Sequence, residues 1–167
     1  MRILGIDPGT RRIGYGLIEK GVGLTLLDYG VIEVVSRDES ARAKEFAGKF
    51  RELIQKSNPD LAGVEKLYFA RNRKTALAVA EACGVIIHLL VEKQIPVKEY
   101  RPGDIKQTLT NYSLSDKTAV AKMVKKILKI NDLTGYDDAS DALAIAITTA
   151  YYHNPWSKKI NDNKERI

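Results

Sequence analysis

The sequence predicts one α/β domain built on a mixed five-stranded sheet, with helices on both faces. After three strand-like segments, short apolar runs alternate with segments of helical periodicity, and strand–helix–strand units of this kind run parallel. The length of 167 residues is that of about one domain, and 44% hydrophobic and 29% charged residues exclude wholesale disorder, collagen and coiled coil. We expect a single domain over residues 1–155 and a frayed or disordered polar tail over 156–167.

The first three elements are strands connected by hairpins. The run from Arg2 to Asp7 is apolar and stops at a Pro-Gly pair, which predicts a buried strand ending in a turn. Ile, Leu, Val and Tyr are abundant from Arg12 to Glu19 and from Leu24 to Val35, so two further strands should follow. Gly14 and Gly16 either weaken the second strand or let another element approach its backbone closely.

The period then changes to that of a helix. Apolar residues recur at helical spacing from Ala43 to Ile54, with charged residues between them. Ser36 and Glu39 have the spacing of a capping box, and Asn58-Pro59 should end the helix. The apolar run from Leu61 to Glu65 predicts a fourth strand.

The remaining elements are a helix, a strand and two more helices. The helix from about Asn72 to Lys93 is apolar nearly all round, which predicts burial on more than one side. A strand follows over Ile95–Tyr100, and its Pro96 indicates a strand start or a sheet edge. The last two helices are expected from about Ser115 to Lys129 and from Asp137 to about His153.

Four carboxylates fall where such a fold forms sites. Asp7 and Glu65 each end a strand, and parallel neighbouring strands would bring both to one edge of the sheet. Asp138 and Asp141 lie one turn apart on the last helix and share a face. Oxygen ligands suit Mg²⁺ or Mn²⁺, and two such ions about 4 Å apart stabilise the attacking and leaving oxygens of phosphodiester cleavage.

Each of these carboxylates also has a structural interpretation. Asp7 could start a turn, Glu65 could be solvated at a strand end, and Asp138 could stabilise the helix dipole. Asp141 lies past the first turn among apolar residues, where a carboxylate usually has a specific partner.

The charge and the cysteine content suggest an intracellular protein with an anionic partner. Lys and Arg number 27 against 21 Asp and Glu, a net charge of +6, and nucleic acid is the commonest large anion. A single cysteine fits the reducing cytoplasm. The sequence has neither a signal peptide nor an uncharged apolar stretch of 18 residues, so we expect a cytoplasmic protein without a membrane partner.

Several short sequence blocks occur in a specific order between Met1 and about His153. They are Gly5-Ile-Asp-Pro-Gly-Thr10, Gly14-Tyr-Gly16, Val64-Glu-Lys66, Ala70-Arg-Asn72, Lys106-Gln-Thr108 and Asp138-Ala-Ser-Asp-Ala-Leu-Ala-Ile-Ala146. Together they resemble the RuvC family of Holliday junction resolvases. The resemblance implies a ribonuclease H-like fold. It also implies a homodimer that uses Mg²⁺, two ions per active site, with Mn²⁺ able to substitute.

The resemblance further implies an activity and its residues. RuvC proteins nick two opposing strands of a four-way DNA junction symmetrically during homologous recombination and DNA repair, with the RuvA–RuvB branch-migration complex as partner. The ends that they leave are a 5′-phosphate and a 3′-hydroxyl. The family's catalytic, metal-binding positions fall on Asp7, Glu65, Asp138 and Asp141, whereas Asp137 is not a family position.

The same resemblance predicts the residues that contact DNA. The family's basic positions fall on Lys106 and Lys117, and its aromatic probe of the junction centre falls on Tyr68, with the adjacent Phe69 as the alternative. Packing within the protein is the other interpretation of these two aromatic residues. We also expect DNA contacts from Arg71 and Lys122, the latter on a lysine-rich helix face that is otherwise typical of solvated surface.

Other functions stay open on sequence alone. A phosphotransferase of the sugar kinase and actin type also opens with a strand, Asp and a Gly-Thr turn, but it needs two related domains. A module that binds junctions without cutting them is a second alternative. Another ribonuclease H-like nuclease, acting on RNA hybrids or on ribosomal RNA precursors, is a third.

Overall fold

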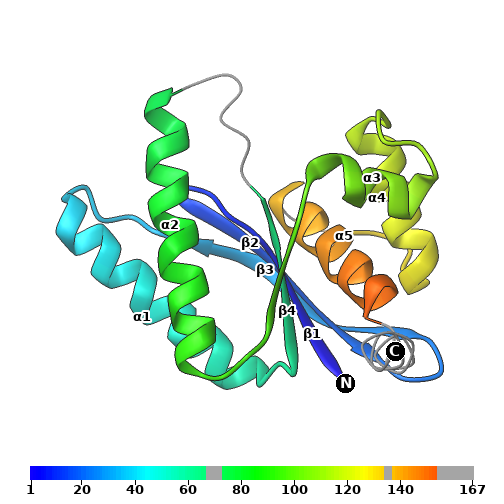
Figure 1. Cartoon of the computed structure of the whole chain (residues 1–167), viewed down its shortest axis with the longest axis horizontal. Coiled ribbons are helices and arrows are strands. Elements are labelled where there is room, and N and C mark those ends of the chain that lie inside the picture. The colour runs from blue at the N-terminus through cyan, green and yellow to red at the C-terminus, as the bar shows by residue number, and fades with distance from the viewer. Residues whose placement is uncertain (67–72, 134–136, 154–167) are drawn as a thin grey trace, which may run out of the picture.

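A computed structural model describes residues 1–66, 73–133 and 137–153 of the chain. In this part, a five-stranded sheet lies between two layers of helices (Figure 1). The strands are β1 (Arg2–Asp7), β2 (Arg12–Lys20), β3 (Leu24–Glu33), β4 (Leu61–Glu65) and β5 (Val97–Tyr100). The helices are α1 (Glu39–Ser57), α2 (Arg73–Glu92), α3 (Pro102–Thr110), α4 (Lys117–Leu128) and α5 (Asp137–Tyr152).

The sheet is mixed, as the sequence predicts. Its strand order is β3-β2-β1-β4-β5, with β1 antiparallel to β2 and β2 antiparallel to β3. The pairs β1–β4 and β4–β5 are parallel, which confirms the expected neighbours. Because Ile6 lies opposite Val64 in the first of these pairs, Asp7 and Glu65 follow at the same edge. Strand β5 begins directly after Pro96 and is the outermost described strand on its side, as that proline indicates.

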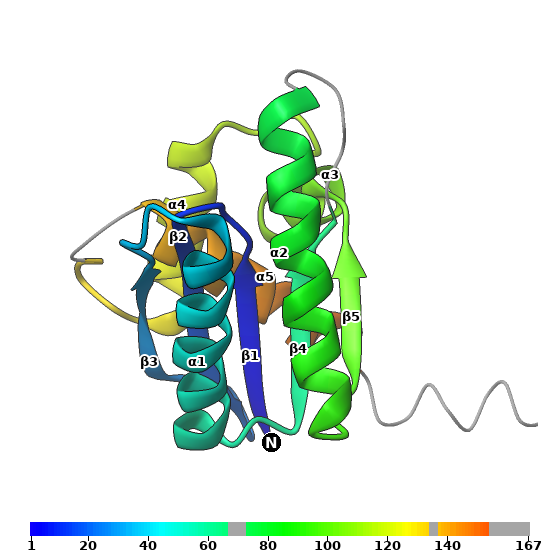
Figure 2. The same cartoon turned by 90° about the vertical axis from the view of Figure 1, so that its left-hand side faces the viewer.

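Each face of the sheet is covered by its own helices. Helices α1 and α2 lie on one face, and α5, backed by α3 and α4, lies on the other (Figures 1 and 2). Side chains of β1 alternate between the two cores: Leu4 and Ile6 pack with Phe50 of α1, whereas Ile3 packs with Leu143 of α5. Among the described helices, none combines the length and apolar character that crossing a membrane requires.

Helix α5 lies unusually close to the sheet because three strands present glycine beneath it. A Cβ atom on Gly5 would collide with the backbone oxygen of Ala142, and one on Gly14 would collide with that of Asp138. A side chain at Gly63 would run into the hydroxyl of Thr149. The close approach that the sequence allows at Gly14 is therefore made by α5.

The predicted capping box at the start of α1 is wrong. Asp38 is the N-cap residue, and its carboxylate accepts a 2.8 Å hydrogen bond from the amide of Ala41. Ser36 lies outside the helix and donates instead to the Glu45 carboxylate at 2.6 Å. Helix α1 accordingly starts at Glu39, because an aspartate nearer the helix provides the better acceptor.

Two further differences concern α3 and α2. The sequence pattern predicts no helix over Pro102–Thr110, yet α3 forms there and buries Ile105 and Leu109. Helix α2 is expected to be buried on more than one side, and it packs against α1 as well as against the sheet, but part of its surface stays exposed within this chain. Its buried residues include Ile86, whereas 63% of Leu77 is exposed. The apolar surface of α2 therefore exceeds what this chain covers.

The glycine contacts predict a specific loss of stability. Replacing Gly5 by alanine should lower the free energy of unfolding by about 1–3 kcal/mol, because the new methyl group would collide with backbone atoms of α5. Gly48→Ala in α1 is the matched control, since nothing lies within 4 Å of its added Cβ. It should stabilise the protein by about 0.5–1 kcal/mol through helix propensity. Chemical denaturation measures both values, and equal effects of the two substitutions would contradict the packing argument.

Candidate active site

Two strand ends and the start of the last helix meet at one edge of the sheet. Asp7 is the last residue of β1 and Glu65 the last of β4, so the parallel register brings them side by side. Asp141, on the first turns of α5, reaches the same place. All three carboxylates line a cleft of about 300 Å³.

Two lysines and an apolar wall complete this cleft. Lys106 comes from α3 and Lys117 from α4, so both helices of the outer layer contribute a cation. The rest of the lining is apolar: Pro102, Ile105, Val120, Ala144 and Ile145. Apolar surroundings exclude water and strengthen the interactions among the charged groups that they enclose.

The carboxylates of Asp7 and Glu65 are destabilised as anions. Burial, and after it the charges of Glu65, Asp141 and Asp138, together raise the pKa of Asp7 from 3.8 to about 8, against a smaller opposing effect of Lys117. Burial also raises the pKa of Glu65, as does the Asp141 charge, while a hydrogen bond with Asp7 opposes this. Without a cation, the pair therefore holds on to a proton near neutral pH.

Cationic side chains partly neutralise the two carboxylates of α5. The Lys117 ammonium lies 2.8 Å from Oδ2 of Asp141, and this hydrogen bond raises the pKa of Lys117. The Arg12 guanidinium, at the start of β2, lies 3.7 Å from Oδ2 of Asp138. Asp138 is not among the residues that line the cleft, so the structure brings three of the four predicted carboxylates together and leaves the fourth beside them.

The donor set fits a hard divalent cation, although its members are not arranged around one. Within residues 1–66, 73–133 and 137–153, no three Asp, Glu, His or Cys side chains are positioned to hold a metal ion. Asp141 and Asp138 each face a cationic side chain instead. The available donors are all carboxylate oxygens, which Mg²⁺ and Mn²⁺ prefer, and the repulsion that raises the pKa of Asp7 is what such an ion would relieve.

The other predicted residues divide into three groups. Lys106 and Lys117 lie in the cleft, whereas Lys122 is exposed on α4 and does not line it. Tyr68, Phe69 and Arg71 lie outside the described residues. Asp137 is exposed at the start of α5, and its charge contributes to the raised pKa of Lys117.

Sequence reasoning missed Arg12 at this site. The residue reads only as the start of a strand, because its pairing with Asp138 joins segments 126 positions apart (138 − 12). The available sequence signal is Gly14, which lies two residues after Arg12. A glycine there allows another element to pack closely against the strand, but it does not identify that element.

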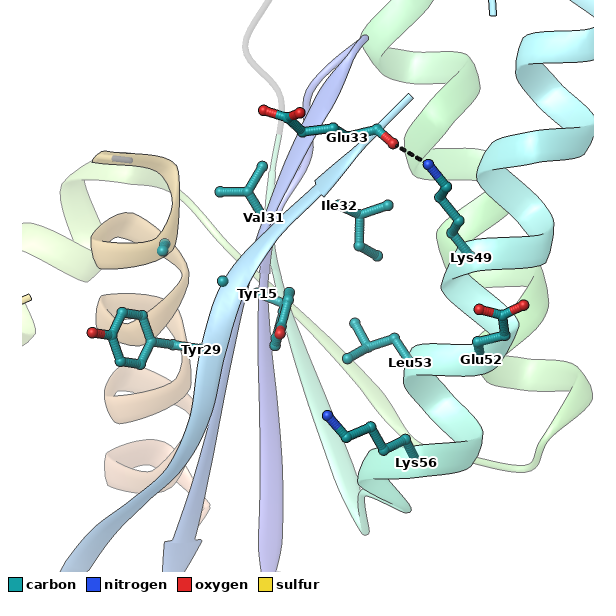
Figure 3. Close-up of a pocket in the computed structure, with 11 residues that line it drawn as sticks. Tyr15, Tyr29, Val31, Ile32, Glu33, Lys49, Glu52, Leu53 and Lys56 are labelled. Carbon is teal, nitrogen blue, oxygen red and sulfur yellow. Dashed lines mark hydrogen bonds between the residues drawn. The ribbon is translucent and has the colours of Figure 1, made fainter. Parts of the chain in front are cut away.

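A larger hollow lies elsewhere and lacks the chemistry of a nuclease. It measures about 870 Å³, lies between β3 and α1, and is lined by Tyr15, Tyr29, Glu52 and Lys56 among others (Figure 3). Lys49 closes one end by donating to the backbone oxygen of Glu33 at 2.7 Å. Its acidic and basic side chains are interspersed and its carboxylates do not converge, so size alone does not make it the active site.

The chain is similar to proteins of one family over most of its length. A family model described as "Crossover junction endodeoxyribonuclease RuvC" matches residues 3–149. The protein of that name from Petrotoga mobilis is 43% identical over 164 residues, which cover 97% of this chain and 98% of its own. The solved structure of Thermus thermophilus RuvC has a TM-score of 0.82 at 30% identity and covers 91% of this chain and 95% of its own. The same enzyme in complex with a Holliday junction substrate gives 0.81 at 29%, with coverage of 91% and 94%.

The raised pKa of Asp7 predicts how the stability of the metal-free protein depends on pH. Between about pH 4 and pH 8 the folded state holds a proton that the unfolded chain has released, so stability falls as the pH rises through this window. Asp7→Asn removes this dependence. In chelator, we expect its melting temperature to exceed that of the wild type at pH 8 and the difference to shrink toward pH 4.

Thermal melts at several pH values test this expectation. Asp132→Asn provides the control, because Asp132 is exposed and pairs with Lys125 away from the cleft. It should follow the wild type throughout. Parallel curves for the wild type and Asp7→Asn would show that Asp7 is not held protonated by its surroundings.

Proposed function

Since the chain belongs to the RuvC family of crossover junction endodeoxyribonucleases, we propose that it resolves Holliday junctions by nicking two opposing strands of a four-way DNA junction. The observation that carries this proposal is the cleft where Asp7, Glu65 and Asp141 face two lysines. Symmetric nicks with 5′-phosphate and 3′-hydroxyl ends can be sealed directly by a ligase, which suits recombination and DNA repair.

Nucleases of this family are metal dependent, and here the metal ligands are Asp7, Glu65, Asp138 and Asp141. Two Mg²⁺ ions per site, with Mn²⁺ as a substitute, fit a set of four carboxylates that repel one another. These ions would supply Lewis-acid stabilisation of the charge that develops during phosphodiester hydrolysis. Asp7 has to release its proton before it serves as a ligand, and Asp141 and Asp138 have to leave their cationic partners.

The lysines of the cleft bind and orient the DNA strand. Lys106 and Lys117 line the same cleft as the carboxylates, which supports a role for both in contacting phosphates near the scissile bond. Such contacts supply salt-sensitive affinity that any DNA would feel. Lys122 extends this basic surface along α4, and Tyr68, or Phe69, together with Arg71 provides the contacts at the junction centre that the family resemblance implies.

Paired nicks require two active sites, so the functional unit is a homodimer. Helix α2 supports this, because Leu77 is 63% exposed and Val91 60% exposed on an apolar helix that the sheet covers only in part. A two-fold dimer presents identical sites to two like strands.

The further partner is the RuvA–RuvB branch-migration complex. The location that we infer is the cytoplasm, where the DNA substrate lies in bacteria.

Removing single carboxylates tests the catalytic assignment. Asp7→Asn and Asp141→Asn should each reduce cleavage of a mobile four-way junction by at least about 10²-fold, because a ligand charge used in the transition state is lost. Junction binding should remain largely intact, and Asp132→Asn serves as the isosteric control outside the cleft. Near-normal turnover by either cleft variant would overturn the assignment.

The wild type should cleave a linear duplex and an RNA–DNA hybrid far more slowly than the junction, and a preference for the hybrid would favour another ribonuclease H-like activity.

A charge on α2 tests the dimer. Leu77→Glu should yield monomers, since it places a carboxylate in the apolar surface that we assign to the contact. Leu114→Glu is the matched control, because Leu114 is 75% exposed in the loop before α4. Analytical ultracentrifugation distinguishes the two states, and a monomeric wild type at micromolar concentration would refute the dimer.

A further inference from the structure

We infer that three lysines on the outer face of α4 form a track for a duplex arm of the junction, next to the active-site cleft but not part of it. Lys122, Lys126 and Lys129 are all exposed and together make up the lysine ridge. The inference rests on the proposed function, because it assumes that a four-way DNA junction occupies the cleft. The ridge adds a second surface, which holds double-stranded DNA beyond the strand that is cut.

The ridge lies on the side of α4 that faces away from the core. At 3.6 residues per turn, its three positions fall on one side of the helix, and the buried residues Val120, Val124 and Leu128 fall on the other. Lys117 is on the buried side as well, where its ammonium reaches Asp141 in the cleft. The cation in the cleft and the ridge therefore serve different parts of the DNA.

Helix α4 begins at the cleft and leads away from it. Lys117 and Val120, both from its first turn, line the cleft, and the ridge follows along the helix. At 1.5 Å per residue, the helix from Lys117 to Lys129 is about 18 Å long, which is the axial length of about five base pairs. A duplex that leaves the cleft along α4 therefore brings several phosphates past the ridge.

The charges of the ridge oppose the stability of the helix that carries them. Lys122 and Lys126 are four residues apart and Lys126 and Lys129 three apart, and like charges at such spacings destabilise a helix. The sequence of α4 contains no Asp or Glu, and Asp132, beyond its end, pairs with Lys125. The helix dipole favours lysines in the last turn, but Lys122 lies too far from it. The repeated charge thus matches an anionic polymer better than it serves the fold.

Lys129 also occupies a backbone conformation that favours glycine. It is the C-cap of α4, with φ 55° and ψ 43° in the left-handed region, and its amide donates to the backbone oxygen of Lys125. A residue with a Cβ atom is strained there, whereas glycine or asparagine is well tolerated. Asn58 and Asn111 hold the same position after α1 and α3. Helix α4 thus gives up stability to end the ridge with a lysine.

The chemistry of the ridge fits the sugar-phosphate backbone of a duplex. Lysine is a flexible point charge that contacts phosphates without reading the base sequence. Each such contact releases counterions, so it appears as a salt dependence of the affinity. An arm that runs over the ridge is fixed in direction relative to the cleft, which helps to present the branch-point strand to the carboxylates.

Lys129→Gly tests the inference, because stability and DNA binding should change in opposite directions. The melting temperature should rise by about 1–4 °C as backbone strain is relieved. Junction affinity should fall about 3–10-fold, and the slope of log affinity against log salt should lose about one unit for each lysine removed. Lys129→Arg keeps the charge and should bind within about twofold of the wild type.

Gln94→Gly is the matched control for the backbone effect. Gln94 has φ 57° and precedes β5, so it lies at the sheet edge opposite to the cleft. Its replacement should raise the melting temperature as Lys129→Gly does, but it should leave junction affinity and the salt slope unchanged.

Arm length tests which part of the DNA the ridge contacts. The probes are junctions with hairpin-capped arms of about 4 or about 15 base pairs, and the variant carries glutamine at all three ridge positions. Lengthening the arms should tighten binding by the wild type at least about tenfold more than binding by this variant. Lys93→Gln removes a charge at the edge opposite to the cleft and should respond to arm length as the wild type does.

Fluorescence anisotropy in chelator measures binding, and cleavage is measured separately in Mg²⁺. Unchanged junction affinity of Lys129→Gly would overturn the inference. An equal loss of salt slope in Lys93→Gln and Lys126→Gln would also overturn it, because the effect would then be general electrostatics. Both outcomes leave the proposed function intact, whereas a wild type that binds junctions without cleaving them would overturn that function alone.

Discussion

The structure depends on how closely α5 packs against the sheet. Gly5, Gly14 and Gly63 remove the side chains that would separate helix from strands, so the helix backbone rests on the strand backbones. The helix presents small residues to the strands, and Ala142 and Ala146 are completely buried there. This contact does more than fill a core, because it decides where the first turns of α5 lie relative to the ends of β1 and β4. A helix held even one side-chain layer further away would carry its carboxylates out of reach of Asp7.

The site that results is electrostatically unfavourable by itself, and the protein relieves it in three different ways. Asp7 and Glu65 share a hydrogen bond, Asp141 has Lys117, and Asp138 has Arg12. Clustering like charges beside an apolar wall reduces the stability of the metal-free fold, as is common where function requires an unusual charge arrangement. A bound cation would relieve the same repulsion. Folding and function thus place opposite demands on these side chains.

Much of this arrangement can be predicted from the sequence, and the predictions that are wrong or missing have identifiable physical causes. The parallel neighbours β1 and β4, and with them the pair Asp7 and Glu65, follow from local apolar runs and general topology rules. Helix α3 escapes such reasoning because it has only two buried apolar residues, Ile105 and Leu109, although Pro102 at its start was an available signal. The capping-box pattern points to Ser36 as the N-cap of α1, whereas Asp38, two residues nearer the helix, occupies that position. Arg12 shows the limit most clearly, since no local pattern reveals a partner that only the tertiary structure brings near.

The order of the elements along the chain has a consequence for synthesis. The site combines the end of the first strand with the beginning of the last helix, so its carboxylates come from both extremes of the fold. A ribosome makes the chain from its N-terminus, and β1 to β4 emerge long before α5 does. Until then the glycine-lined face has no helix to cover it, and the cleft lacks one of its walls. A nascent chain therefore lacks the complete cleft until the segment that forms α5 has left the ribosome.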